Sequence, residues 1–207
     1  MVKVFAVRVG DKYGPEYEDY LKSKLDITFL NEEKENFMLQ WNKIHFFNLD
    51  IDEPICVIDI DIELINDYHK IFEYPIERND FLSMRSWWET DPNACELNGG
   101  FYKFYPKDTK FMYNLFRYEK RFWERYFIDV KKLKPGPVAG EENFVDFAVR
   151  KFGLNLRFIP DQWTCRWVKN PTSKWLSKIN RKYPGKYVKL DKFNDDVKLL
   201  HYTMNDW

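Results

Sequence analysis

The residues best suited to chemistry in this sequence are two aspartates, Asp59 and Asp61, which are separated only by Ile60. They close a run over residues 55–60 that is apolar apart from Asp59 and rich in β-branched side chains. A short run of this kind predicts a strand buried on both faces. Ligands of open α/β sheets collect beyond the carboxyl ends of the strands, so the two carboxylates favour a hard divalent cation as their partner. The alternative is a turn whose acids cap a following helix.

Two further residues could bind a nucleotide. Tyr13 lies in the loop of residues 10–15, after a predicted strand over residues 3–9. Lys43 lies on a predicted helix over residues 36–47, directly before the aspartate strand, where an ammonium group could reach a phosphate. The alternatives are that Tyr13 packs at a helix start and that Lys43 is solvated. The loop lacks the GxGxxG fingerprint, so a dinucleotide is not indicated.

A later segment could contact a sugar. Gly99 and Gly100 precede a predicted strand over residues 101–105, and two glycines at this place imply a close approach of the backbone to another group. Asn98 beside them offers both a donor and an acceptor to hydroxyl groups. A plain β-bulge is the alternative explanation for the glycines.

The order of the remaining elements predicts an α/β fold that positions these residues. Strands are expected over residues 27–30, 81–87, 156–159 and 197–201, and helices over residues 15–24, 64–72, 109–126 and 141–152. Pro15 suits the first turn of its helix, and the loop of residues 131–140 ends where Glu141 and Glu142 suit a helix N-terminus. Without catalysis, this helix-start role alone would account for both acids.

Composition excludes several classes of protein. The 207 residues suffice for one sizeable core, contain no apolar stretch long enough to span a membrane, and do not begin like a signal peptide. Three scattered cysteines argue against a disulfide framework and favour a reducing, cytoplasmic compartment.

Charge is distributed unevenly although the formal net charge is zero. Residues 1–100 hold 10 Lys and Arg against 21 Asp and Glu, whereas residues 101–207 hold 23 against 12. This polarity does not fit a dedicated nucleic-acid binder, which carries a basic excess over the whole domain. Residues 169–192 combine basic and aromatic side chains, a pattern more often found on a solvated face than on a docking site.

Several motifs, in order, resemble those of GT-A glycosyltransferases of the glycogenin type across nearly the whole chain. ICVIDIDIEL resembles the strand that ends in a DxD motif, and LNGGFYKFYP resembles the N-[SG]-G strand that leads into a long helix. GEENFVDFAV takes the place of the G-D-Q segment, LRFIPDQWTCRW resembles a late strand, and VKLLHYTMNDW resembles the terminal HF-x-G segment. NKIHFF matches the position of a lysine that reaches the nucleotide-sugar. The chain also resembles glycosyltransferase domains of large algal viruses of the chlorovirus type, which act on capsid glycans.

The resemblance implies a mixed, mostly parallel central sheet flanked by helices and a single domain over residues 1–207, with a nucleotide-binding part over about 1–66 and an acceptor side over about 67–207. It implies a Mn²⁺ or Mg²⁺ ion held by Asp59, Asp61 and His201, and a UDP-sugar as donor. The residues implied to bind the donor are Val7, Val9, Tyr13, Lys43, Asp59, Ile60, Asn98 and Gly99. The implied partners are the nucleotide-sugar and a glycan or glycoprotein acceptor. Neither a nucleic-acid partner nor a transmembrane segment is expected. The resemblance is also compatible with further domains in a longer chain. For a viral protein, the expected location is the host cytoplasm.

Glu141 and Glu142 are the implied catalytic residues. Either could act as the general base of an inverting reaction, or could only orient the sugar in a retaining one. Trp87 or Trp163 could form an apolar wall for a sugar ring. The motifs depart from the family where the G-D-Q segment reads Glu141-Glu142, and where no glycine or lysine follows His201 to hold the diphosphate.

Two other classes remain open at this point. Phosphatases of the HAD type also carry a strand that ends in DxD, but Glu63 stands where they usually have Thr or Val, and the motif comes late in the chain. A non-catalytic binding or assembly domain on a degenerate transferase fold would use the basic, aromatic segment of residues 169–192. The sequence favours a metal-dependent transfer of a sugar from a UDP-type donor, and the resemblance to the viral domains implies a capsid glycoprotein as acceptor.

Overall fold

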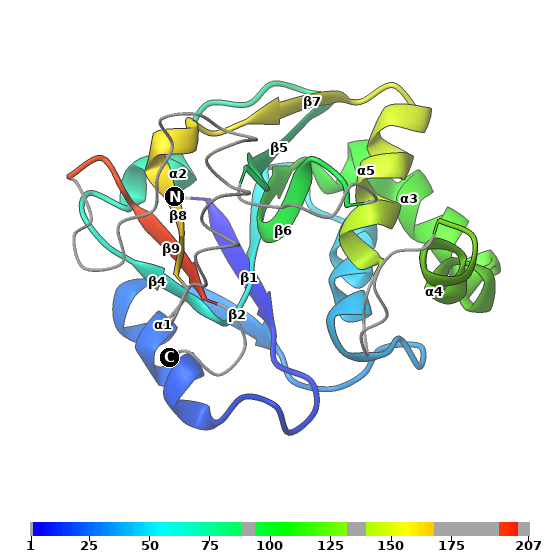
Figure 1. The fold of residues 1–207 in the computed structure, drawn as a ribbon, viewed down its shortest axis with the longest axis horizontal. Helices are drawn as coiled ribbons and strands as arrows, with labels where there is room; N and C mark the ends of the chain where they lie inside the picture. The colour runs from blue at the N-terminus through cyan, green and yellow to red at the C-terminus, as the bar shows by residue number, and fades with distance from the viewer. Residues whose placement is uncertain (1, 88–93, 132–139, 168–194, 203–207) are drawn as a thin grey trace, which may run out of the picture.

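A six-stranded mixed sheet forms the centre of the computed structural model, which describes residues 2–87, 94–131, 140–167 and 195–202 (Figure 1). Its strands follow the order β2-β1-β3-β6-β5-β7, and only β6 runs antiparallel to its neighbours. The strands are β1 (Lys3–Val7), β2 (Ile27–Leu30), β3 (Ile55–Ile58), β5 (Asp80–Arg85), β6 (Leu97–Phe104) and β7 (Asn155–Phe158). The predicted α/β fold with a mixed, mostly parallel sheet is confirmed.

A smaller sheet lies beside the carboxyl end of β3. It contains β4 (Ile62–Leu64), β9 (Leu199–Tyr202) and β8 (Thr164–Trp167), in that order. Strand β9 pairs antiparallel with β4 and parallel with β8. Segments that are far apart in the sequence therefore meet directly after the aspartate strand.

The central sheet is buried on both faces, which accounts for the continuous apolar run of β3. Cys56 and Ile58 point into one core with α1 (Pro15–Lys24), α2 (His69–Glu73) and the smaller sheet. Ile55 and Val57 point into the other core, which is rich in aromatic rings. That second core is covered by the 3₁₀ helix η1 (Leu39–Asn48) and by α3 (Pro106–Tyr118), α4 (Lys120–Asp129) and α5 (Glu141–Lys151).

Three predicted helices differ from the structure. The predicted helix over residues 109–126 is two helices, α3 and α4, which meet at Glu119. No proline or glycine marks this break. The break lets Phe116 of α3 and Trp123 of α4 both pack against Phe144 of α5, with ring centroids 5.3 Å and 5.2 Å from it.

The predicted helix over residues 36–47 is instead the 3₁₀ helix η1. The carboxamide of Asn42 donates to the carbonyls of Phe37 and Leu39 and accepts from the backbone of Lys34, which ties the start of the segment in a non-α-helical path. Of the apolar side chains in this segment, Trp41 and Ile44 are buried, whereas Met38 is exposed.

The predicted helix over residues 64–72 begins in a strand, β4, and becomes helical only in α2. Strand β4 pairs with β9, and the backbone of Ile65 donates to Lys198. Because this partner lies more than a hundred residues later, the local sequence pattern could not indicate it. The predicted loop of residues 131–140 and the basic segment of residues 169–192 lie largely or wholly outside the described residues.

Candidate active site

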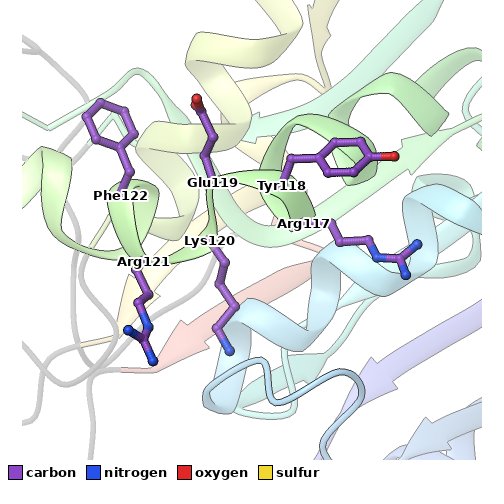
Figure 2. Close-up of a pocket in the computed structure, with 6 residues that line it drawn as sticks. All are labelled: Arg117, Tyr118, Glu119, Lys120, Arg121 and Phe122. Atoms are coloured by element: carbon purple, nitrogen blue, oxygen red, sulfur yellow. The ribbon is translucent and has the colours of Figure 1, made fainter.

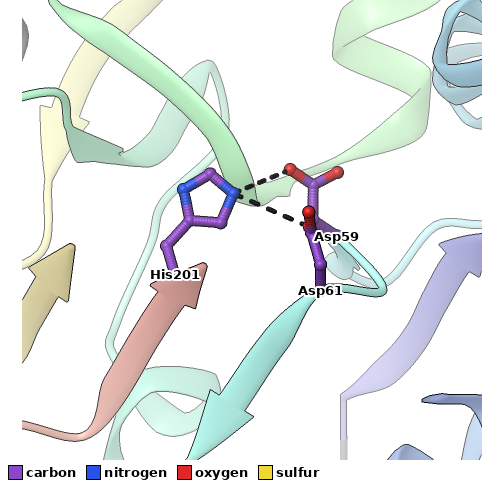
Figure 3. Close-up of side chains that lie close together, drawn as sticks. All are labelled: Asp59, Asp61 and His201. Atoms are coloured by element: carbon purple, nitrogen blue, oxygen red, sulfur yellow. Dashed lines mark ion pairs between the residues drawn. The ribbon is translucent and has the colours of Figure 1, made fainter. Parts of the chain in front are cut away.

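Two aspartates and one histidine converge where β3 ends (Figure 3). Asp59 follows β3, Asp61 precedes β4, and His201 lies on β9 opposite Ile62. The Nε2 atom of His201 is 3.4 Å from Asp59 Oδ2 and 3.8 Å from Asp61 Oδ1. One potential ligand atom from each residue lies within 4.8 Å of the others. The structure thus brings together the three predicted metal ligands.

Each of these three side chains is held from behind by a different residue. The other oxygen of Asp59, Oδ1, is 2.5 Å from the ammonium of Lys43, and the other oxygen of Asp61, Oδ2, accepts a 2.7 Å hydrogen bond from Tyr13. The other ring nitrogen of His201, Nδ1, is 2.5 Å from Nη1 of Arg166. Outer partners such as Lys43 and Tyr13 orient the carboxylate ligands of metals in proteins. They leave Asp59 Oδ2, Asp61 Oδ1 and His201 Nε2 facing one another.

Lys43 is the electrostatic centre of the site. It is buried, donates a 2.9 Å hydrogen bond to the carbonyl of Gly99, and lies 3.8 Å from the carboxylate of Glu141. Burial alone would lower the pKa of Lys43, but the charges of Asp59 and Glu141 raise it above its usual value. Burial would likewise raise the pKa of Asp59, but Lys43 and His201 hold it well below its usual range. Both groups therefore stay charged and paired.

Glu141 and Glu142 begin α5 beside this cluster. Glu141 is 2% exposed, and its carboxylate accepts a 3.3 Å hydrogen bond from the hydroxyl of Tyr102. Burial raises the pKa of Glu141 to about 8, against the opposing charge of Lys43. Glu142 accepts a 2.8 Å hydrogen bond from the backbone N–H of Gly99, and burial raises its pKa as well.

Gly99 connects the two halves of the site, and a side chain there would crowd both of them. The pairing of β5 with β6 shifts register between Ser83 and Met84, opposite the glycines, which is the kind of irregularity that a β-bulge produces. A Cβ atom on Gly99 would lie 3.0 Å from Lys43 Nζ and 3.1 Å from Glu142 Oε1. The bulge and the close approach are therefore the same feature: it presents the Gly99 carbonyl to Lys43 and the Gly99 N–H to Glu142.

Other predicted site residues are placed differently. Ile60 is 3% exposed and its side chain belongs to the core, so only its backbone is available. Val7 ends β1 and packs against the aromatic core, and Val9 follows it in the loop. Asn98 is buried, and its side-chain oxygen accepts from the N–H of Gly100, so that oxygen already has a backbone donor.

The predicted apolar wall is wrong for Trp87. This side chain is 4% exposed and its ring N–H donates to Thr164, so it is a core residue without a free face. Trp163 is half-buried and packs edge-on against Tyr74, with the ammonium of Lys198 over its ring.

Sequence reasoning missed two residues of the site. Tyr102 lies on β6, in the motif whose glycines indicate a close approach of the backbone, and its hydroxyl donates to Glu141. Arg166 reaches His201 only because β8 and β9 pair in parallel with these two residues in register. No local signal in the sequence indicates that register.

A surface hollow of about 490 Å³ lies elsewhere, at the junction of α3 and α4. Figure 2 shows that the side chains lining it fan out in different directions from six consecutive residues, 117–122. None of them is among the residues that hold the acidic cluster. The convergent groups at the end of β3 are the better candidate for an active site.

Solved glycosyltransferases share this architecture. The apo form of the glycosyltransferase GlyE of Streptococcus pneumoniae TIGR4 matches 100% of this chain with a TM-score of 0.64 at 13% identity, over 55% of its own chain. A second GlyE structure matches 99% of this chain with a TM-score of 0.56 at 11% identity, over 48% of its own. The galactosyltransferase LgtC, solved with donor and acceptor sugar analogs, matches 97% of this chain with a TM-score of 0.50 at 10% identity, over 87% of its own.

The chain has a GT-A glycosyltransferase-like fold. It spans about half the length of GlyE. A scan of protein-family models and a search of the curated proteins find no match. Within the described residues, no helix is both long enough and apolar enough to cross a membrane.

The residues present fit a divalent metal ion. Two carboxylate oxygens and one imidazole nitrogen form a mixed oxygen and nitrogen donor set, which suits Mn²⁺ better than the all-oxygen octahedra that Mg²⁺ prefers. The positive charge of Lys43 offsets one carboxylate from behind without taking a place between the three ligand atoms.

Proposed function

We propose that this protein transfers a sugar from a nucleotide diphosphate sugar of the UDP type to a glycan or protein acceptor. The observation that carries the proposal is the convergence of Asp59 Oδ2, Asp61 Oδ1 and His201 Nε2 at the end of β3 in a GT-A glycosyltransferase-like fold. A Mn²⁺ ion held there would neutralise the charge that develops on the leaving diphosphate.

The chain's own residues would prepare the site for this charge. Lys43 and Tyr13 fix the rear oxygens of Asp59 and Asp61, so the two carboxylates need little reorganisation when a donor arrives. Burial, with the nearby charge of Asp61, raises the pKa of Tyr13, which keeps its hydroxyl a hydrogen-bond donor. Tyr13 lies in the loop after β1 and would also contact the nucleotide.

Glu141 and Glu142 would divide their roles. Glu141 is buried behind Lys43 and bonded to Tyr102, so we assign it to the support of the lysine. Glu142 is only half-buried and is held by Gly99, so we assign it to the sugar or to the acceptor hydroxyl. Burial raises its pKa, which makes its carboxylate a better proton acceptor.

The proposal is tested by incubating the protein with UDP-, GDP- and dTDP-sugars and measuring nucleoside diphosphate release with Mn²⁺ and with EDTA. Turnover of one donor class only with Mn²⁺ is the expected result. Release of inorganic phosphate from phosphoesters would instead support the phosphatase alternative. If no donor is turned over and no donor binds in a Mn²⁺-dependent way, the proposal is refuted and the non-catalytic alternative remains.

A further inference from the structure

Arg166 occupies a place beside the candidate metal site that the proposed function does not use. It lies on β8, its backbone is the partner of His201 in the parallel pairing of β8 with β9, and its guanidinium contacts the ring of that histidine. The distance from Arg166 Nη1 to His201 Nδ1 is 2.5 Å. A permanently charged group therefore contacts one of the three ligand residues directly.

The contact determines where the imidazole proton lies. A guanidinium group only donates hydrogen bonds, so Nδ1 of His201 must be the acceptor and the ring proton must be on Nε2. Nε2 is the nitrogen that faces Asp59 Oδ2 at 3.4 Å and Asp61 Oδ1 at 3.8 Å. A metal ion at this place needs the lone pair of Nε2, with the proton on Nδ1 instead. While Arg166 remains on Nδ1, His201 therefore presents a proton where the metal would bind.

Arg166 is also well suited to a diphosphate. One divalent ion does not neutralise all the negative charge of the nucleoside diphosphate that leaves in the reaction, and the planar fork of an arginine matches phosphate oxygens. Lys43, a buried cation beside the ligands, is already bonded to Asp59 and to the Gly99 carbonyl. Movement of Arg166 from His201 to a phosphate would add positive charge at the diphosphate. It would also remove the contact that keeps the ring proton of His201 on Nε2.

We propose that Arg166 binds the diphosphate of the donor and that its departure from His201 allows the histidine to bind the metal. The ring proton would then move from Nε2 to Nδ1 by exchange with water, which would leave the lone pair of Nε2 available to the metal. This inference rests on the proposed function. It makes metal and diphosphate binding cooperative: Arg166 opposes the metal alone and favours the metal together with a diphosphate.

The test is a calorimetric titration of wild type and Arg166→Met with Mn²⁺ alone, and with UDP and UMP at saturating Mn²⁺. In the variant, Mn²⁺ alone should bind at least as tightly as in wild type. UDP should bind roughly 10- to 100-fold more weakly, the usual effect of one charged hydrogen-bonding group, and UMP should change much less. Arg125→Met is the matched control, because Arg125 is an exposed helix residue paired with Asp129.

Two results overturn the inference alone: UDP affinity equal to wild type in Arg166→Met, or equal losses for Mn²⁺, UDP and UMP, as expected of a merely structural residue. Absence of Mn²⁺-dependent UDP binding in wild type would refute the UDP donor and this inference together. The proton position is read separately by ¹⁵N NMR of the three histidines without metal. His201 should be protonated on Nε2 in wild type and shift towards Nδ1 protonation in Arg166→Met; an Nδ1 proton in wild type would overturn the inference whether or not the variant folds.

Discussion

The site at the end of β3 and the junction of α3 with α4 both gather charged and aromatic side chains, but they are built differently. At the first, Tyr13, Lys43, Asp59 and His201 come from four distant segments, and their polar atoms point at one another. At the second, six consecutive residues, 117–122, project outward, and Tyr118 and Phe122 are 81% and 50% exposed. Charge density alone therefore does not identify a site; convergence of side chains held by distant partners does.

The largest expected effect is on activity at the first region. Asp59→Asn would remove a proposed metal ligand and the main partner of Lys43, so Mn²⁺-dependent donor turnover should fall roughly 100-fold or more. Asp67→Asn, at an exposed aspartate paired with Lys70, is the control and should be close to wild type. Steady-state kinetics of nucleoside diphosphate release measures both. Equal turnover of the two variants would remove Asp59 from the mechanism.

The next effect is on stability. Lys43→Met would leave the carboxylate of Asp59 without its counter-charge, which should cost about 3–5 kcal/mol of unfolding free energy. Lys70→Met breaks only an exposed ion pair and should cost about 0–1 kcal/mol. Urea denaturation compares the two. A loss below about 1 kcal/mol in Lys43→Met would contradict a central electrostatic role.

A smaller effect concerns pH. Because the folded protein holds a proton on Glu141 up to pH about 8, while the unfolded chain releases it near pH 4.5, Glu141 makes stability fall as pH rises between these values. Glu141→Gln should remove this part of the pH dependence, so the variant gains stability relative to wild type from pH 5.5 to pH 8. Denaturation at both pH values measures it, with exposed Glu32→Gln as control. Parallel profiles of wild type and Glu141→Gln would show that Glu141 is ionised in the folded protein.

The smallest effect is expected at the α3–α4 junction. Arg121 is exposed, so Arg121→Gln should change stability by less than about 0.5 kcal/mol and leave donor turnover unchanged. The same assays used for Asp59→Asn and Lys43→Met apply. A large loss of turnover in Arg121→Gln would mean that the junction belongs to the active site and would reverse the comparison between the two regions.

The sequence predicted those features that depend on neighbouring residues. The apolar run before Asp59, the glycines before residue 101 and the acids at the start of α5 are local patterns, and the structure contains the corresponding strand, bulge and helix. His201 could be connected to Asp59 only through the resemblance to a family, because its contact depends on the pairing of β9 with β4.

The features that the sequence could not predict depend on packing between distant segments. The break between α3 and α4 has no proline or glycine and is explained by two rings that pack on Phe144. Arg166 meets His201 only in one register of β8 against β9. The contact of Lys43 with a phosphate stays a prediction, and the bonds of its ammonium to Asp59 and Gly99 join segments that are distant in the sequence.

The most direct test of the central claim is calorimetric titration of UDP into the protein with and without Mn²⁺, for wild type and Asp61→Asn. We expect wild type to bind UDP much more tightly with Mn²⁺, and this gain to be lost in Asp61→Asn although the variant stays folded, because the amide oxygen can still accept from Tyr13. Mn²⁺-dependent UDP binding that survives in Asp61→Asn would contradict the assignment of the metal site to the end of β3.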